Sequence, residues 1–242
     1  SCEPDAILIT AGDSDTFTPW YSRIVEGVRP DVAVINVHLL NTPWYLRSIM
    51  TYYPDLPLSL AGDSIDALRP IKWDSSAVEV VTLDNSIKPF KFLPQPSYGE
   101  YLVTADQVLI DILKTNMWKR PICFSIGFGD NVPLGLRNYC RLDGLVWKLC
   151  PDSINREDIS RLESNIRNYD YRGYGDYDFL DLTGLRMGQN YFSGFGRLAE
   201  YYKSINDDDG LNRLRELFLQ HWPGKERADI IFGQGENEGG SD

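Results

Sequence analysis

The sequence predicts an α/β fold, in which a parallel sheet forms a Rossmann-like three-layer module with an appended C-terminal helical hairpin. Two apolar runs, residues 6–11 and 32–37, have the composition of buried strands. Each run is followed by the tetrapeptide Thr-Pro-Trp-Tyr, at residues 18–21 and 42–45. Thr is a good helix N-cap and Pro is favoured at the first helical position, so each tetrapeptide predicts a helix start. Two strand–turn–helix units in succession are typical of a parallel sheet.

The middle of the chain is less regular. Residues 52–97 are rich in Pro, Asp and Ser, and within them residues 78–83 alternate as a short strand does. Residues 98–103 are a second candidate for a short strand. Thr104 and Gln107 have the spacing of a capping box, with Thr at the N-cap and Gln three positions later. They predict a helix that begins there.

That helix has apolar residues along one face and closes at Asn116. Residues 121–127 predict the next buried strand. Residues 136–149 carry apolar side chains at helical spacing, and Pro151 ends the helix that they predict. These elements complete an α/β domain over residues 1–151.

The remaining chain differs in character and predicts a helical C-terminal region with a Tyr-rich loop over residues 152–232. A single helical hairpin resembles one tetratricopeptide-like unit, and such arrays need about three repeats, so we expect the hairpin to dock on the α/β domain. The predicted elements are a polar helix, the Tyr-rich loop, the two hairpin helices and a disordered tail, over residues 156–166, 168–182, 187–205, 211–221 and 233–242.

Composition excludes several functions for the 242-residue chain. A net charge of -11 argues against nucleic acid, whose phosphates need a basic face. No stretch approaches the ~20 apolar residues of a membrane span. The cysteines lack Cys-x-x-Cys spacing, and with two histidines they argue against a structural zinc site. We expect buried free thiols, since Cys140 and Cys150 pair only if their Cα atoms lie within ~7 Å.

The sharpest chemical candidate is the acidic turn Asp13-Ser14-Asp15-Thr16, between the first strand and its helix. Both predicted helix starts lie at the carboxyl edge of the sheet, where open α/β folds bind ligands. Asp13 and Asp15 form an Asp-x-Asp pattern, which nucleotide-sugar transferases use to place a divalent cation on a diphosphate. In the alternative, these side chains bond nearby backbone N–H groups and stabilise a helix N-terminus. We expect the structural role, and no cofactor is predicted beyond the candidate cation.

Aromatic and polar side chains near the same edge form a second candidate ligand-binding set. Trp20, Tyr21, Trp44 and Tyr45 would stack on sugar rings if exposed; in the alternative they pack the helices onto the sheet. The second strand brings Asn36, followed by His38, to this edge. A lone histidine without a visible Ser or Cys partner is weak evidence for a catalytic triad, so a structural role is favoured.

Longer motifs lie along nearly the whole chain. They are residues 12–17, 20–21, 25–32, 36, 39–42, 44–45, 115–122, 135–136, 139, 142, 144–145, 151, 169–173 and 197–199. These motifs resemble a family of large bacterial multi-spanning membrane proteins, formerly of unknown function and now grouped with protein O-mannosyltransferases. Asn41 joins the candidate ligand-binding set as part of these motifs. The chain departs from the pattern at Ser14, Thr18 and Asp143, where Asn, Pro and Glu are usual.

The resemblance implies a soluble carboxyl-terminal region that follows the membrane helices and faces the extracytoplasmic, periplasmic side. The sugar donor of such enzymes is lipid-linked, and the catalytic carboxylate lies in the membrane part. We therefore expect an accessory domain that binds acceptor protein or glycan, with the membrane-embedded part of its own parent protein as partner. Two alternatives stay open: a metal-dependent sugar-active enzyme that uses Asp13 and Asp15, and a purely structural or assembly module.

Overall fold

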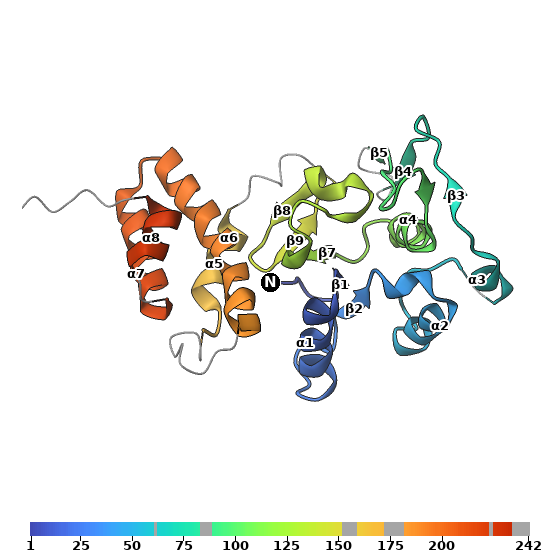
Figure 1. Cartoon of the computed structure of the whole chain (residues 1–242), viewed down its shortest axis with the longest axis horizontal. Helices are drawn as coiled ribbons and strands as arrows, with labels where there is room; N and C mark the ends of the chain where they lie inside the picture. Colours follow the sequence, from blue (N-terminus) through green and yellow to red (C-terminus); the bar gives the residue numbers. More distant parts are fainter. Residues whose placement is uncertain (61, 83–88, 152–158, 172–181, 223–224, 234–242) are drawn as a thin grey trace, which may run out of the picture. The chain divides into compact units, whose positions relative to one another are not determined.

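Five strands form the main sheet in the order β2-β1-β7-β9-β8 (Figure 1). Their bounds are β1 Ile7–Thr10, β2 Ala33–Asn36, β7 Ile122–Ser125, β8 Cys140–Leu142 and β9 Val146–Leu149. The computed structural model describes residues 1–60, 62–82, 89–151, 159–171, 182–222 and 225–233. By contacts the chain divides into two compact units, residues 2–141 with 146–157, and residue 1 with 142–145 and 158–242.

The first two strands are parallel neighbours, as the sequence predicts. Ile7 pairs with Ala33 on one side of β1 and with Ile122 of β7 on the other, both in parallel register. Strand β9 runs antiparallel to β7, with Phe124 opposite Trp147. The sheet is therefore mixed: its centre is parallel, as predicted, and β9 adds an antiparallel neighbour that the sequence did not predict.

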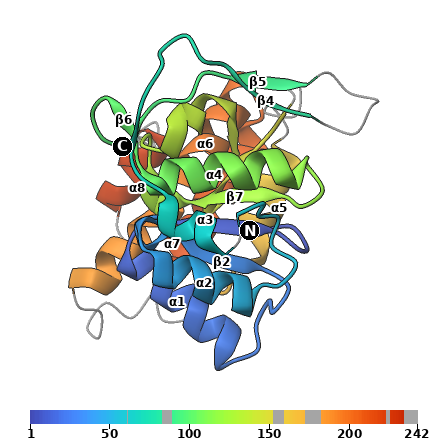
Figure 2. The ribbon, with the colours of Figure 1, turned by 90° about the vertical axis from the view of Figure 1, so that its right-hand side faces the viewer.

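Side chains of β1 alternate between two apolar cores. Ile7 and Ile9 pack in a large core with residues of helices α2 (Pro43–Tyr52) and α4 (Thr104–Asn116). Leu8 lies in a smaller cluster, against which Trp20 packs. Successive strand residues point to opposite faces, so both faces of β1 are buried. Figure 2 shows α4 lying along β7 on the side of the large core.

The two tetrapeptides do not act alike. The second starts α2 at Pro43, directly after Thr42, as predicted. The first lies inside helix α1 (Asp13–Ile24), so the predicted start at residue 18 is wrong. The helix begins at Asp13 because the acidic residues Asp13 and Asp15 favour a helix N-terminus. Pro19 is accommodated in the helix interior.

Short elements fill the middle of the chain. The strands predicted within residues 78–83 and 98–103 are confirmed as β4 and β6. The N-cap of α4 is Val103 rather than Thr104, because Asp106 accepts the Val103 N–H at 3.1 Å and so takes the place predicted for Gln107. Helix α4 ends at Asn116, as predicted. The bounds here are η1 Leu39–Asn41, α3 Asp63–Ala67, β3 Ile71–Lys72, β4 Glu79–Val81, β5 Phe90–Phe92 and β6 Tyr101–Leu102.

The helix predicted over residues 136–149 is wrong. A 3₁₀ segment, η3 (Pro133–Tyr139), leads instead into the strands β8 and β9. The Cys150 N–H donates to the Tyr139 carbonyl at 2.9 Å, and β9 pairs with β7. Sheet pairing therefore overrides the helical spacing of the apolar residues. A 3₁₀ segment, η2 (Ile126–Phe128), follows β7.

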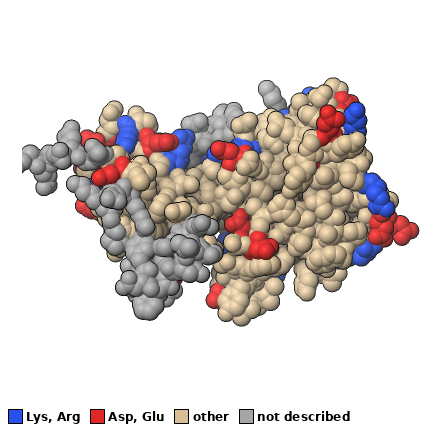
Figure 3. Space-filling model, viewed as in Figure 1, with Lys and Arg blue, Asp and Glu red and all other residues tan. Residues whose placement is uncertain are grey.

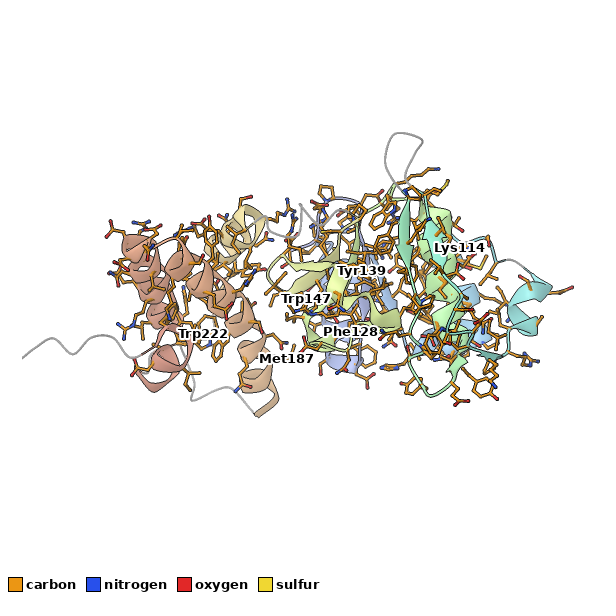
Figure 4. The ribbon with its side chains drawn as sticks, turned by 90° about the horizontal axis from the view of Figure 1, so that it is seen from above. Lys114, Phe128, Tyr139, Trp147, Met187 and Trp222 are labelled. Atoms are coloured by element: carbon orange, nitrogen blue, oxygen red, sulfur yellow. The ribbon has the colours of Figure 1, made fainter. Side chains whose placement is uncertain are left out.

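The C-terminal unit is helical, and four helices are described: α5 Ser160–Asn168, α6 Leu182–Ser204, α7 Asp208–His221 and α8 Lys225–Phe232. The predicted hairpin is confirmed as α6 and α7, and Asp207 caps α7 by accepting the Gly210 N–H at 2.8 Å. Sequence reasoning missed α8. Phe195, Phe218 and Trp222 are buried in the core of this unit, and Trp222 is labelled in Figure 4. Most of the predicted Tyr-rich loop, residues 172–181, and residues 234–242 of the predicted tail lie outside the described residues.

None of the described helices combines the length and hydropathy that crossing a membrane requires. The cysteines Cys2, Cys123, Cys140 and Cys150 are free thiols, and the last three are buried, as expected.

Candidate functional site

The acidic turn is fastened to the end of β7. Ser125 donates its hydroxyl to the Asp15 carboxylate at 2.6 Å, and the Ala11 N–H donates to the same hydroxyl oxygen at 3.3 Å. Gly127 lies so close to Asp15 that a methyl group at this position would overlap the carboxylate. Asp13 and Ser14 are exposed to solvent. Asp15 therefore holds the loop after β7 against the first turn of α1.

The same turn was the candidate cation site. Among the residues that the structure describes, no group of three or more His, Cys, Asp or Glu side chains is arranged to hold a metal ion. Hard divalent cations take about six or more oxygen ligands, of which Asp13 and Asp15 would supply a minority. The carboxylate of Asp15 is already engaged by Ser125.

Thr16 is the centre of a buried polar network that joins α1 to β1 and β2. Its hydroxyl lies 2.7 Å from that of Thr10, donates to the Gly12 carbonyl at 2.6 Å and accepts the Asn36 side-chain N–H at 2.9 Å. Thr10, Thr16 and Asn36 are all buried. Because their polar groups satisfy one another, these side chains fix the geometry of the sheet edge.

Asn36 also shapes the turn that follows β2. The side-chain oxygen Oδ1 of Asn36 accepts the backbone N–H groups of His38 at 2.9 Å and Leu39 at 3.1 Å. These two hydrogen bonds stabilise the start of the segment η1. Asn41 ends this segment and accepts the Ala105 N–H at 3.0 Å. Asn41 thus fastens the first turn of α4, while His38 is left exposed.

The four candidate aromatic residues divide into a buried and an exposed pair. Trp20 is half-buried and donates its indole N–H to the Val34 carbonyl at 3.2 Å. Tyr45 is 3% exposed, and its hydroxyl accepts the Asn36 N–H at 2.9 Å. Burial raises the pKa of Tyr45 to about 12. Tyr21 and Trp44 are 56% and 59% exposed. Trp20 and Tyr45 therefore pack the helices, and Trp44 and Tyr21 face solvent.

Helix α1 carries an exposed apolar face that sequence reasoning missed. The apolar residues of this face are three or four positions apart in the sequence, which is helical spacing. The face was missed because the helix was expected to begin later. The exposed residues on or directly after the helix are Phe17, Tyr21, Ile24, Val25 and Val28.

A pocket of about 490 Å³ opens where β2 and β7 end. Val37 and His38, which follow β2, line one side, and the segment from Gly127 to Gly135, which follows β7, lines another. The pocket brings together two of the predicted site residues, His38 and Asn41. Its position is the carboxyl edge of the parallel strands, where open α/β sheets bind ligands.

Most of the pocket lining was not predicted. Gln95 lies in the irregular stretch of residues 52–97, Tyr98 begins the candidate strand of residues 98–103, and Asn131 lies in a segment for which no element was predicted. The loop that contains Asn131 could have been predicted to lie at the pocket. Residues 121–127 predict a third strand of the sheet, and the loop that follows this strand starts at the same edge. The loop containing Gln95 gave no such signal, since tertiary contacts alone bring it there.

A model of the family TMEM260-associated domain 2 matches residues 1–62 and 76–168. The chain belongs to this family. Both tetrapeptides, the acidic turn and every segment that lines the pocket lie within the part that matches TMEM260-associated domain 2. No curated protein and no solved structure gives a significant match to the chain.

Proposed function

We propose that the chain is an extracytoplasmic, periplasmic accessory domain of a glycosyltransferase-like membrane protein, and that it binds acceptor protein or glycan. The observation that carries the proposal is the pocket of about 490 Å³ at the ends of β2 and β7. Its size falls within the range of about 300–1,000 Å³ that is typical of ligand sites. Membership of the TMEM260-associated domain 2 family supports a link to a membrane protein.

The proposal includes the finer fold and family assignments. In it, the sheet and its helices form a Rossmann-like three-layer domain, and the parent protein belongs to the bacterial membrane proteins that are grouped with protein O-mannosyltransferases. The partner is the membrane-embedded part of that parent. The exposed apolar face of α1 supports a partner of this kind, because exposed apolar patches mark interaction sites.

Binding without turnover is favoured by how the carboxylates near the sheet edge are used. The Asp15 carboxylate is held by Ser125, and the buried Asp106 accepts two backbone N–H groups and the Ser97 hydroxyl. General acid–base catalysis needs a group that is positioned to exchange a proton with substrate. The two engaged carboxylates instead stabilise the loops around the pocket.

Activity and binding assays on the purified chain test the proposal. We expect no transfer or hydrolysis of sugar nucleotides or lipid-linked sugars, and a change of tryptophan fluorescence when glycans or glycopeptides are titrated. Trp44→Ala tests whether the exposed indole contributes to that change, and Trp20→Phe is the matched control at the half-buried indole. Turnover that Asp13→Ala abolishes would replace the accessory function with the metal-dependent enzyme.

A further inference from the structure

The pocket presents polar side chains that the fold does not use. Within the part of the chain that the structure describes, no hydrogen bond engages the His38 imidazole, the side-chain amides of Gln95 and Asn131, or the Tyr98 hydroxyl. His38, Gln95, Tyr98 and Asn131 are all exposed in the pocket lining. In contrast, the Asn41 side chain accepts the Ala105 N–H, and the Ser97 hydroxyl donates to Asp106.

The four side chains combine hydrogen-bond donors and acceptors. A side-chain amide carries both, a phenol hydroxyl acts as either, and an imidazole offers two ring nitrogens. Apolar residues also line the pocket. They are Val37, Val103, Phe128, Val132 and Leu134, of which Phe128 is labelled in Figure 4. The lining therefore combines apolar contacts with polar groups, as ligand sites do.

The charged residues of the pocket lining indicate whether a neutral or an anionic ligand fits. No Lys or Arg is among the described residues that line the pocket, and its charged side chain is Asp130, which lies 3.4 Å from Arg137. Sites for phosphate use Arg or Lys, or the free N–H groups of a helix N-terminus. On the face that Figure 3 shows, charged side chains of the α/β unit are scattered, with wide uncharged areas between them.

Two backbone N–H groups at the start of α4, which borders the pocket, are already engaged within the protein. The Val103 N–H donates to the Asp106 carboxylate at 3.1 Å, and the Ala105 N–H donates to Asn41 at 3.0 Å. Asp106 is 1% exposed, and its side chain accepts the N–H groups of Ser97 and Val103. A phosphate placed there would have to compete with this side chain for the same donors.

We propose that this pocket binds an uncharged, polyhydroxylated ligand, a neutral sugar unit, and selects it against sugar phosphates and nucleotide sugars. His38, Gln95, Tyr98 and Asn131 bond the hydroxyl groups, while the apolar lining residues contact the C–H groups of the ring. This inference rests on the proposed function and names its ligand class: the neutral glycan or acceptor side rather than the charged donor.

Titration calorimetry on the full chain tests the ligand class. The probes are methyl glycosides and neutral disaccharides of mannose, glucose and galactose, each compared with its 1-phosphate and its nucleotide-activated form. We expect saturable binding of at least one neutral probe, with a Kd of about 1 mM or below, and at least tenfold weaker binding of the phosphorylated forms. Phosphorylated probes that bind as well or better, or no binding of either class, would overturn the inference.

Variants locate the site. Gln95→Ala and Asn131→Ala each remove hydrogen bonds to the ligand, so we expect each to weaken binding about fivefold. Asn212→Ala, which removes an exposed amide on α7, is the matched control and leaves affinity unchanged. Neutral-sugar binding that both pocket variants leave intact would refute the pocket as its site. Turnover of a bound probe would instead overturn the accessory function, while the ligand class stands.

Discussion

The two copies of Thr-Pro-Trp-Tyr place the same side chains in opposite environments. In the first copy, Trp20 packs on the sheet and Tyr21 is 56% exposed; in the second, Tyr45 is 3% exposed and Trp44 faces solvent. The difference follows from where each copy lies in its helix, since Pro43 begins α2 whereas Pro19 lies inside α1. A local motif therefore sets a preference, and the preceding residues decide which face it presents.

Replacing the two tyrosines gives the largest expected contrast. Tyr45→Ala removes a buried ring and the acceptor of the Asn36 N–H, so we expect a loss of about 3–5 kcal/mol in the free energy of unfolding. Tyr21→Ala changes that free energy by about 0.5 kcal/mol or less, because the ring is exposed. Urea denaturation followed by circular dichroism measures both. Equal losses would contradict the inverted environments.

The same buried phenol makes stability depend on alkaline pH. Burial raises the pKa of Tyr45 from an ordinary value of 10.0 to about 12, so the folded state holds a proton that the unfolded state releases. The contribution of Tyr45 is fully present below pH 10 and is lost as the pH rises through 12. We expect the free energy of unfolding to fall by about 2–3 kcal/mol more across this window in wild type than in Tyr45→Phe.

Tyr21→Phe serves as the control in that pH series. The pH dependence of its free energy of unfolding should follow that of wild type, because the buried phenol of Tyr45 is unchanged. A wild-type curve that matches Tyr45→Phe throughout the window would show that the phenol ionises as freely in the folded state as in the unfolded state.

The two prolines give the next contrast. Pro19 has no N–H to donate to the Asp15 carbonyl four residues earlier, and its ring crowds that carbonyl. We expect Pro19→Ala to raise the free energy of unfolding by about 1–2 kcal/mol. Pro43 occupies a first helical position, where no such bond is lost, so Pro43→Ala changes it by about 0.5 kcal/mol. Thermal or urea unfolding measures both, and destabilisation by Pro19→Ala would contradict this account of α1.

The acidic turn tests why α1 starts earlier than its Thr-Pro-Trp-Tyr copy. Asp15→Asn weakens the interaction with Ser125 and with the helix N-terminus, so we expect a loss of about 0.5–2 kcal/mol in the free energy of unfolding. In calorimetry with Mn²⁺ or Ca²⁺, we expect no saturable binding by the wild-type chain. Binding in wild type that Asp15→Asn weakens about tenfold would favour the metal-dependent enzyme.

Local sequence predicted the parallel pair β1–β2, the strand β7, the end of α4 and the hairpin α6–α7. Each has a strong local signal: a continuous apolar run, a terminating Asn or helical periodicity with a turn between. Residues 136–149 carry an equally strong helical spacing, yet they form β8 and β9 because β9 pairs with β7. Pairing with a distant strand is invisible to a local pattern.

The sequence by itself determined the α/β class, the two parallel strands and the carboxyl edge of the sheet at which the pocket lies. Tertiary structure decided which residues line that pocket. Of the predicted set, Thr16, Asn36 and Tyr45 bond one another or the backbone, while His38 joins Gln95 and Asn131 around the pocket. The physical reason is that polar groups near a buried sheet edge must find partners, and only the assembled loops determine which side chains find theirs within the protein.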